Sequence, residues 1–336
     1  MPGRCIRTDT VRAIEAYRIV EQAVPEPGAG EVRLRIAACG VGHVDALHAT
    51  GRYQMAATVP FVPGVEVAGI VDALGPDVEG LAVGERVLSM VTVKDGFSDY
   101  TLVPARHLAK LPASMGLAEA ASIRVNALTA LYALKDRGQV RVGETVLVFG
   151  AAGGVGSAAV TIAQILGARV IAAASTEEKR LYARALGSAA CVDTAPEGWR
   201  DRLADAAARV SGEANGRGQL DVVFDPVCGP LFGPAFRSLG WKGRHLVIGF
   251  VAGKIPYLKA NLPLLKGASL VGVDIRNFNL READAAEANR DLLRQWLADG
   301  TFPPPPVQTF AFERFREALL NAASGKTPGK TVLVMD

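Results

Sequence analysis

The sequence predicts an α/β protein in which a β-rich first domain precedes a doubly wound, six-stranded parallel sheet. Two observations support this class. From about residue 118 onward apolar strands alternate with helical segments, whereas short strands bounded by Gly, Pro or Asp predominate before it. In the second part, the apolar run at 145–149 passes directly into a glycine cluster and then into a helix, which is typical of a nucleotide-binding βα unit.

Composition limits the class of protein further. The length of 336 residues and the hydrophobic content of 49% allow a large core and two domains. A net charge of +3 without basic runs argues against a nucleic-acid partner. The N-terminus lacks an apolar signal core, and no segment reaches the ~18 apolar residues of a membrane helix, so we expect a cytoplasmic protein with no membrane partner. The four cysteines are widely spaced, which predicts reduced thiols.

Residues 1–123 form the predicted β-rich domain, which the chain completes when it returns at 277–336. Its strands are expected at 31–36, 65–71 and 85–91. The connection at 39–53 is polar and contains glycine, and it carries two of the four histidines. We therefore expect chemistry in this connection.

Residues 124–276 form the predicted dinucleotide-binding domain. Strands are expected at 145–149, 169–173, near 191, at 220–224, 245–248 and 270–273. Helices are expected at 128–134, from 155 to 166, and at 177–186, 197–210 and 231–239. Six parallel strands separated by helices give a doubly wound sheet with right-handed crossovers, so a ligand belongs at the carboxyl ends of the strands. Beyond this domain, helices at 284–297 and 313–323 precede a last strand at 331–334.

The glycine cluster has the residue types that a pyrophosphate site requires. Gly153 and Gly154 let backbone N–H groups approach a phosphate at the N-terminus of the following helix, and Gly156 permits that helix to pack closely on the strand. The strict G-x-G-x-x-G pattern is not met, because Ala151 occupies the first glycine position.

The end of the second strand predicts NADP(H) rather than NAD(H). A carboxylate roughly 20 residues past the glycine turn usually binds the ribose 2′-OH of NAD, but Ala174 stands in that position. Ser175 and Lys179 follow it and are able to meet a phosphate. The alternative is that Ser175 only caps the next helix and that Lys179 is solvated.

At this point the sequence resembles the medium-chain dehydrogenase/reductase superfamily. The likeness rests on the segments 60–69, 143–156, 221–226 and 329–333, which span almost the whole chain. The resemblance implies that the first domain has a GroES-like fold. The zinc ligands of the alcohol dehydrogenases in this superfamily are replaced here by Gly42, Val65 and Val125; Glu66 alone remains, and Val44 replaces the relay hydroxyl. One carboxylate cannot make a catalytic zinc site, so we expect no metal.

The chain therefore resembles the zinc-independent quinone oxidoreductase branch, which transfers hydride from NADPH without a metal. The resemblance implies three candidates for catalytic roles. Tyr53 and Arg124 would act as donors near the substrate oxygen, and Asp45 would either transfer a proton or hold its loop. We expect His245, inside a strand, to have no catalytic role.

The resemblance also implies a set of cofactor contacts. These are Thr129 at the carboxamide, Ala152, Gly153, Gly154, Val155 and Gly156 at the pyrophosphate, Ser175 and Lys179 at the 2′-phosphate, and Gly249, Phe250 and Val251 at the nicotinamide ribose. Thr194 and Gly325 stand where the family often has Tyr and Arg, and Lys330 or Lys326 would compensate at the adenosine end.

Three functions fit this pattern. The protein is an NADPH-dependent quinone reductase, an enoyl reductase acting on an α,β-unsaturated carbonyl or thioester, or a noncatalytic NADPH-binding protein. The first two share the same hydride geometry and differ only in the pocket, which would be shaped by Tyr53, Arg124 and Phe278.

The last strand of the nucleotide domain predicts a homodimer. The segment 269–273 is sixth in the sheet and therefore an edge, yet it carries no charge before Asp274. Such an apolar edge requires a cover, which the same edge of a second subunit would supply by antiparallel pairing. Alternatively, the segment from Asn277 onward folds back over it.

Overall fold

The computed structural model describes residues 2–10, 13–50, 58–212 and 218–335. Its contacts divide the chain into two compact units. The first unit contains 1–125 and 294–336, and the second contains 126–293. Among the described residues, none of the helices is both long and apolar enough to cross a membrane.

The second unit extends beyond the expected boundary at 277. Phe278 is buried and stacks on Tyr132, with ring centroids 4.0 Å apart. Asn289 binds the side chains of Lys135 and Asp136, at 3.0 and 2.7 Å. These contacts hold the segment after 277 on the second unit, whereas the first boundary lies within two residues of the expected one.

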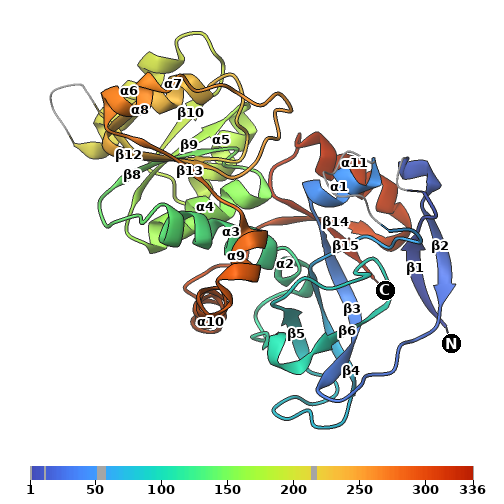
Figure 1. Cartoon of the computed structure of the whole chain (residues 1–336). Helices are drawn as coiled ribbons and strands as arrows, with labels where there is room; N and C mark the ends of the chain where they lie inside the picture. Colours follow the sequence, from blue (N-terminus) through green and yellow to red (C-terminus); the bar gives the residue numbers. More distant parts are fainter. Residues whose placement is uncertain (1, 11–12, 51–57, 213–217, 336) are drawn as a thin grey trace. The chain divides into compact units, whose positions relative to one another are not determined.

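The first unit is built mainly of strands (Figure 1). They are β1 (Gly3–Arg7), β2 (Arg18–Gln22), β3 (Glu31–Val41), β4 (Val67–Leu74), β5 (Arg86–Ser89), β6 (Tyr100–Pro104), β7 (Leu108–Lys110), β14 (Val307–Ala311) and β15 (Lys330–Val334). Its α-helices are α1 (His43–Ala49), α2 (Leu117–Ala120) and α11 (Phe315–Ser324), and short 3-10 turns lie at η1 (Ile14–Ala16), η2 (Ala105–His107) and η4 (Phe312–Arg314).

One sheet of order β14-β15-β3-β4-β5-β7 organises this unit, and β6 also pairs with β3. β1 and β2 form a separate antiparallel pair. The apolar side chains of β3 that alternate with arginines, such as Val32, Leu34 and Ile36, are fully or almost fully buried in the core, as the period of two predicts. The C-terminal segment completes the first unit, because β15 pairs antiparallel with β3 in the middle of the sheet.

The second unit alternates strands and helices. Its strands are β8 (Thr145–Phe149), β9 (Arg169–Ala174), β10 (Ala190–Asp193), β11 (Leu220–Asp225), β12 (Leu239–Val247) and β13 (Ser269–Gly272). Its helices are α3 (Arg124–Leu131), the π-helical η3 (Tyr132–Arg137), α4 (Gly154–Ile165), α5 (Glu177–Ala185), α6 (Trp199–Ser211), α7 (Phe232–Arg237), α8 (Asn261–Lys266), α9 (Ile275–Arg281) and α10 (Ala283–Asp299); α3 begins and α10 ends in the first unit.

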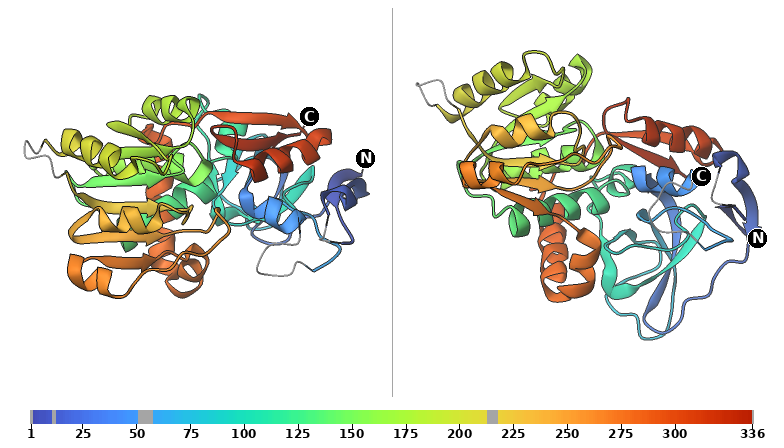
Figure 2. Two further views of the ribbon diagram at one scale, coloured as in Figure 1. Left: turned by 90° about the horizontal axis from the view of Figure 1, so that it is seen from above. Right: turned by 45° about the horizontal axis from the view of Figure 1, so that its top comes forward.

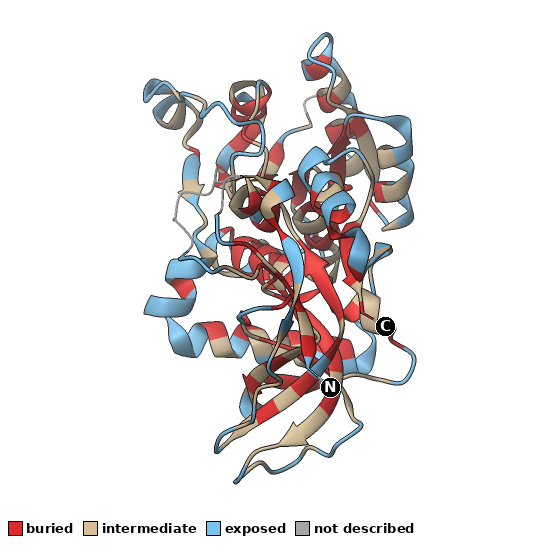
Figure 3. Cartoon of the chain, turned by 90° about the vertical axis from the view of Figure 1, so that its right-hand side faces the viewer, coloured by how far each residue is buried: buried red, intermediate tan, exposed pale blue. Residues whose placement is uncertain are grey.

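All neighbouring strands of this unit are parallel, in the order β10-β9-β8-β11-β12-β13. Side chains of α6 and α7 pack with the sheet in one core cluster, and Figure 2 shows further helices on the opposite face. The predicted doubly wound six-stranded sheet is therefore confirmed. Figure 3 shows that buried residues concentrate in the strands of both units.

Three local expectations differ from the structure. The connection at 39–53 is not a plain loop, because its first residues extend β3 and the next form α1, while 51–57 lie outside the described residues. The predicted helix at 128–134 begins earlier and ends in the π-helical segment η3. β12 begins at Leu239, six residues before the expected start, since its first part runs beside Leu220 of β11.

Candidate functional site

The glycine turn links β8 to α4. Gly150 adopts a positive φ of 59° directly after β8 and makes the tight turn. It thereby takes the part of the first glycine of the motif, whose position Ala151 occupies. A Cβ added at Gly156 would lie 2.1 Å from the Gly150 carbonyl oxygen, so helix and strand approach as closely as predicted. A Cβ at Gly154 would lie 2.9 Å from the Asn126 side chain, so Gly154 leaves room for Asn126. The sequence did not predict a role for Asn126.

This turn fits the pyrophosphate of a dinucleotide. Gly153 is the exposed N-cap of α4, and an added Cβ there would meet only the Gly150 oxygen, at 3.3 Å. The first N–H groups of a helix have no carbonyl partner within the helix, and the helix dipole places partial positive charge there. Ala152, Val155 and Gly156 complete the predicted contacts of this turn, which is open on its outer side at Gly153.

The carboxyl end of β9 carries no acid. Ala174 is its last residue and pairs with Asp193 at the end of β10. Thr176 caps α5 by accepting a hydrogen bond from Lys179 N at 3.3 Å, so the alternative in which Ser175 is the cap is wrong. Ser175 is exposed at the end of the strand, as a phosphate ligand requires.

Arg180 is a second cation at this end of the sheet, for which the sequence predicts no separate role. Its Nη1 lies 3.2 Å from the Ala174 carbonyl oxygen and 2.8 Å from Asp193 Oδ2, and its Nη2 lies 2.8 Å from Glu177 Oε2. The sequence shows a cation one position after Lys179, but only the pairing of β9 with β10 brings Asp193 to it. The two carboxylates offset the charge of this guanidinium.

The segment predicted to bind the nicotinamide ribose follows β12, at the carboxyl side of the same sheet. Thr129, predicted to bind the carboxamide, lies on α3. Phe250 and Val251 follow β12 with exposed fractions of 40% and 55%. Val251 N donates to the Pro226 carbonyl oxygen at 3.4 Å, so this segment lies beside the turn after β11. Thr129 is buried to 7% exposure.

In the first unit, a buried ion pair lies among the positions that correspond to the zinc ligands of the alcohol dehydrogenases. Glu66 and Lys330 are 1% and 7% exposed, and Lys330 Nζ lies 2.6 Å from Glu66 Oε1. The other carboxylate oxygen accepts the N–H of Val125 at 3.0 Å. A Cβ added at Gly42 would lie 3.3 Å from the same Nζ, so an ammonium group stands beside this former ligand position.

This pair corrects the role that the sequence suggested for Lys330. A phosphate ligand has to present its charge to a bound nucleotide, whereas the ammonium of Lys330 is buried and already paired with a carboxylate. Lys326, the other lysine considered, is exposed. The predicted role of Lys330 as a cofactor ligand is therefore wrong.

Asp45 makes the contacts of a loop-holding residue. It is 3% exposed, and its carboxylate accepts the N–H groups of Gly42 at 2.7 Å and Gly64 at 3.2 Å. Burial raises the pKa of Asp45, against the opposing effect of those N–H groups and of the Lys330 ammonium. The geometry favours this role over the proton transfer that was also considered.

Arg124 is the second predicted catalytic residue, at the start of α3. Its Nη2 donates to the Val65 carbonyl oxygen at 2.6 Å and its Nη1 approaches Thr92 Oγ1 at 3.4 Å. Tyr53, the third candidate, lies outside the described residues. Phe278, which we expected to shape the substrate pocket, is instead 3% exposed beneath Tyr132.

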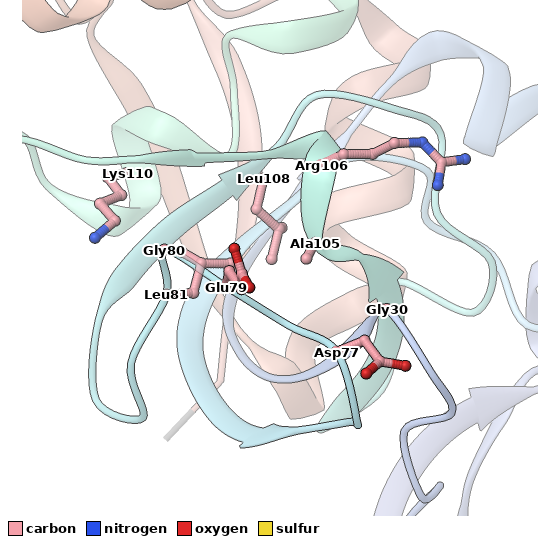
Figure 4. Close-up of a pocket in the computed structure, with 9 residues that line it drawn as sticks. All are labelled: Gly30, Asp77, Glu79, Gly80, Leu81, Ala105, Arg106, Leu108 and Lys110. Carbon is pink, nitrogen blue, oxygen red and sulfur yellow. The ribbon is translucent and has the colours of Figure 1, made fainter.

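A separate surface cavity of about 460 Å³ lies in the first unit, lined by the loop at 77–81, η2 and β7 (Figure 4). Charges of both signs line it, from Asp77, Glu79, Arg106 and Lys110, together with Leu81 and Leu108. None of the residues predicted for catalysis or cofactor binding lines this cavity, and we assign it no role.

Comparison with known proteins shows the family of this chain. Residues 28–113 match the family described as "Alcohol dehydrogenase GroES-like domain", and residues 154–291 match "Zinc-binding dehydrogenase". "Quinone oxidoreductase-like protein 2" of Bos taurus is 33% identical over 98% of this chain and 93% of its own length. The structure of mycobacterial Rv1454c complexed with NADPH is 27% identical with a TM-score of 0.83 over 99% of both chains, and that of CurK enoyl reductase is 25% identical with a TM-score of 0.86 over 100% of both.

A GroES-like unit together with a doubly wound sheet and its glycine turn defines an oxidoreductase of the dinucleotide-binding kind. More closely, the chain belongs to the medium-chain dehydrogenase/reductase superfamily, in its quinone oxidoreductase branch. The resemblance noted from the sequence is thereby confirmed.

The family description mentions zinc, whereas the resemblance places Gly42, Val65 and Val125, which have no metal-binding side chains, at the ligand positions. Within the described ranges, no group of three or more His, Cys, Asp or Glu side chains is placed to hold a metal ion. The Lys330 ammonium is already bound to Glu66, so a second cation would meet electrostatic repulsion there. We predict that elemental analysis of protein purified without chelators finds no stoichiometric zinc; one zinc ion per chain would contradict this.

Proposed function

We propose that this protein transfers hydride from NADPH to an electron-poor carbon of a quinone, with an α,β-unsaturated carbonyl or thioester as the alternative substrate. The observation that carries the proposal is the open glycine turn at the start of α4, followed by a second strand that ends without an acid at Ala174. The name of the bovine relative supports a quinone, and CurK enoyl reductase supports the alternative.

When bound, NADPH supplies the hydride from C4 of its nicotinamide. The chain's part is to position that ring and to stabilise the charge that develops on the substrate oxygen. Thr129 would hold the carboxamide, and the segment at 249–251 the adjacent ribose. Arg124 or Tyr53 would donate to the oxygen, while Asp45 holds the loop between Gly42 and Gly64.

One experiment separates the candidate functions. Steady-state turnover with NADPH is measured for one quinone and for one enone, at equal enzyme concentration. A kcat/KM for the quinone at least tenfold above that for the enone supports the first function, and the reverse order supports the alternative. NADPH binding without turnover of either compound would support the noncatalytic function and overturn both reductase proposals.

The cysteines are consistent with the proposed cytoplasmic location. All four lie in the described part of the chain and are free thiols, three of them buried. Free thiols are typical of reducing compartments.

We also propose a homodimer that forms through β13. This strand is an edge of the sheet, as predicted, and Leu270 on it is 45% exposed, so the described residues leave part of the strand accessible. Exposed apolar side chains on and next to α8 accompany it: Trp241, Leu264 and Leu265, at 74%, 82% and 71%. A second copy would bury these groups and pair the free strand.

Val271→Lys tests this interface. A charge on the edge strand disfavours pairing with a second copy, so we expect light scattering to give the monomer mass. Val142→Lys, at a loop position that is 84% exposed, adds the same charge elsewhere and should leave the dimer intact. A folded Val271→Lys protein with the dimer mass of the wild type would refute the interface.

A further inference from the structure

A buried carboxylate and a buried imidazole meet at the end of β11. Asp225 is the last residue of that strand, and its Oδ2 lies 3.1 Å from Nε2 of His245 on β12. The two residues are 1% and 0% exposed. His245 lies among the rings of Phe232 and Phe236, with centroids 4.5 and 6.1 Å away. Because a carboxylate only accepts hydrogen bonds, Nε2 carries the hydrogen of this bond.

The other carboxylate oxygen holds the turn that follows the strand. Asp225 Oδ1 accepts the N–H of Val227 at 2.9 Å and that of Cys228 at 2.7 Å. Cys228 has a positive φ of 47°, which a residue with a side chain rarely adopts, so the turn depends on such contacts. The bond from His245 fixes the orientation of the carboxylate that makes them.

This turn lies between two segments proposed to bind the cofactor. On one side, Cγ2 of Val227 would be 3.4 Å from a Cβ placed at Gly150, the first residue of the glycine turn. On the other side, the carbonyl oxygen of Pro226 accepts the N–H of Val251 at 3.4 Å, and that of Val227 accepts the N–H of Ala252 at 3.1 Å. A displacement of the turn would therefore move the segment at 249–252.

Packing in the apolar core does not by itself explain a histidine at position 245. Within the described residues, Nδ1 of His245 is buried and has no hydrogen-bond partner. A buried polar atom without a partner costs stability, which Leu or Phe at this position would avoid. The bond from Nε2 to Asp225 is what His245 provides beyond packing.

We propose that Asp225 and His245 act as positioning residues that hold the turn at 226–228 against the nicotinamide side of the cofactor site. This inference rests on the proposed dinucleotide binding. The pair preorganises the segment at 249–252, so the cofactor does not have to order it upon binding.

His245→Phe and His245→Met remove the donor but keep an apolar side chain of comparable size among Phe232 and Phe236. His245→Gln retains an N–H donor and is the conservative rescue. Leu246→Ala, at the neighbouring buried position of β12, is the control for a loss of stability that leaves the turn's contacts in place. Equilibrium binding of NADPH and of 2′,5′-ADP, which lacks the nicotinamide half, is measured well below each melting temperature.

We expect the Phe and Met variants to bind NADPH about tenfold more weakly, since they lose one buried hydrogen bond that orders the turn. Binding of 2′,5′-ADP should stay within about twofold of the wild type, because it carries no nicotinamide ribose for the segment at 249–252 to bind. The Gln variant should recover most of the NADPH affinity. One folded apolar variant is sufficient for the test.

Unchanged NADPH affinity in a folded apolar variant would overturn the inference and leave the proposed function intact. Equal weakening of NADPH and 2′,5′-ADP would also overturn it, because the pair would then support the whole unit. Wild-type protein that binds neither compound would overturn the proposed function, and this inference with it.

Discussion

Lys330→Met is expected to lower the free energy of unfolding of the first unit by about 3–5 kcal/mol. The substitution leaves the carboxylate of Glu66 buried at 1% exposure without its cation, close to a second buried carboxylate at Asp45. Because an uncompensated buried charge costs more than the pair itself contributes, the effect should exceed that of an ordinary surface substitution several-fold.

Denaturant unfolding measures this loss. The double variant Glu66→Gln/Lys330→Met removes both charges while the Gln oxygen can still accept the N–H of Val125, so it should recover most of the lost stability. Lys326→Met, at an exposed position of the same segment, should change stability by less than about 0.5 kcal/mol. If Lys330→Met stays within about 1 kcal/mol of the wild type, the ion pair does not have the role assigned to it.

The second large effect concerns the choice of cofactor. We expect NADPH to bind more tightly than NADH, and Lys179→Ala to weaken NADPH by roughly tenfold to a hundredfold, because a charge-assisted hydrogen bond is worth about 1.5–3 kcal/mol. NADH carries no 2′-phosphate, so its affinity should change little. Arg180→Ala should have a smaller effect than Lys179→Ala, because Glu177 and Asp193 already offset its charge.

Titration of each variant with both cofactors by fluorescence gives the dissociation constants. Arg184→Ala, in the last turn of α5, removes a positive charge at an exposed position away from the strand end and should leave both constants unchanged. An NADPH constant that Lys179→Ala does not alter would remove that lysine from the site. Equal affinity of the wild type for NADPH and NADH would overturn the proposed cofactor choice itself.

The doubly wound sheet and the glycine turn are properties of short stretches, and the sequence predicts them for that reason. The apolar strand before Gly150 and the helical period after Gly154 are set by the spacing of side chains along a few turns of chain. Alternating strands and helices with right-handed crossovers then indicate the doubly wound class, in which the sixth strand is an edge. Even the free edge at β13 could be inferred in this way.

Roles that depend on a partner distant in sequence could not be predicted. Lys330 is predicted to compensate at the adenosine end because Gly325 stands where the family often has Arg, whereas the pairing of β15 with β3 brings Lys330 to Glu66. Phe278 was assigned to the substrate pocket, yet it stacks on Tyr132. In both cases the sequence shows the charge or the ring of the side chain, but it does not show which distant residue that group contacts.

The sequence by itself therefore determined the class of fold, the glycine turn after β8 and the absence of an acid at Ala174, since each depends on local residue types. Only the tertiary structure decided which charges are paired. Sheet pairing brings Asp193 to Arg180, Lys330 to Glu66 and His245 to Asp225, and no local pattern encodes these neighbours. The physical reason is that burial and ion pairing depend on distances in space, which are set only when the strands have found their partners.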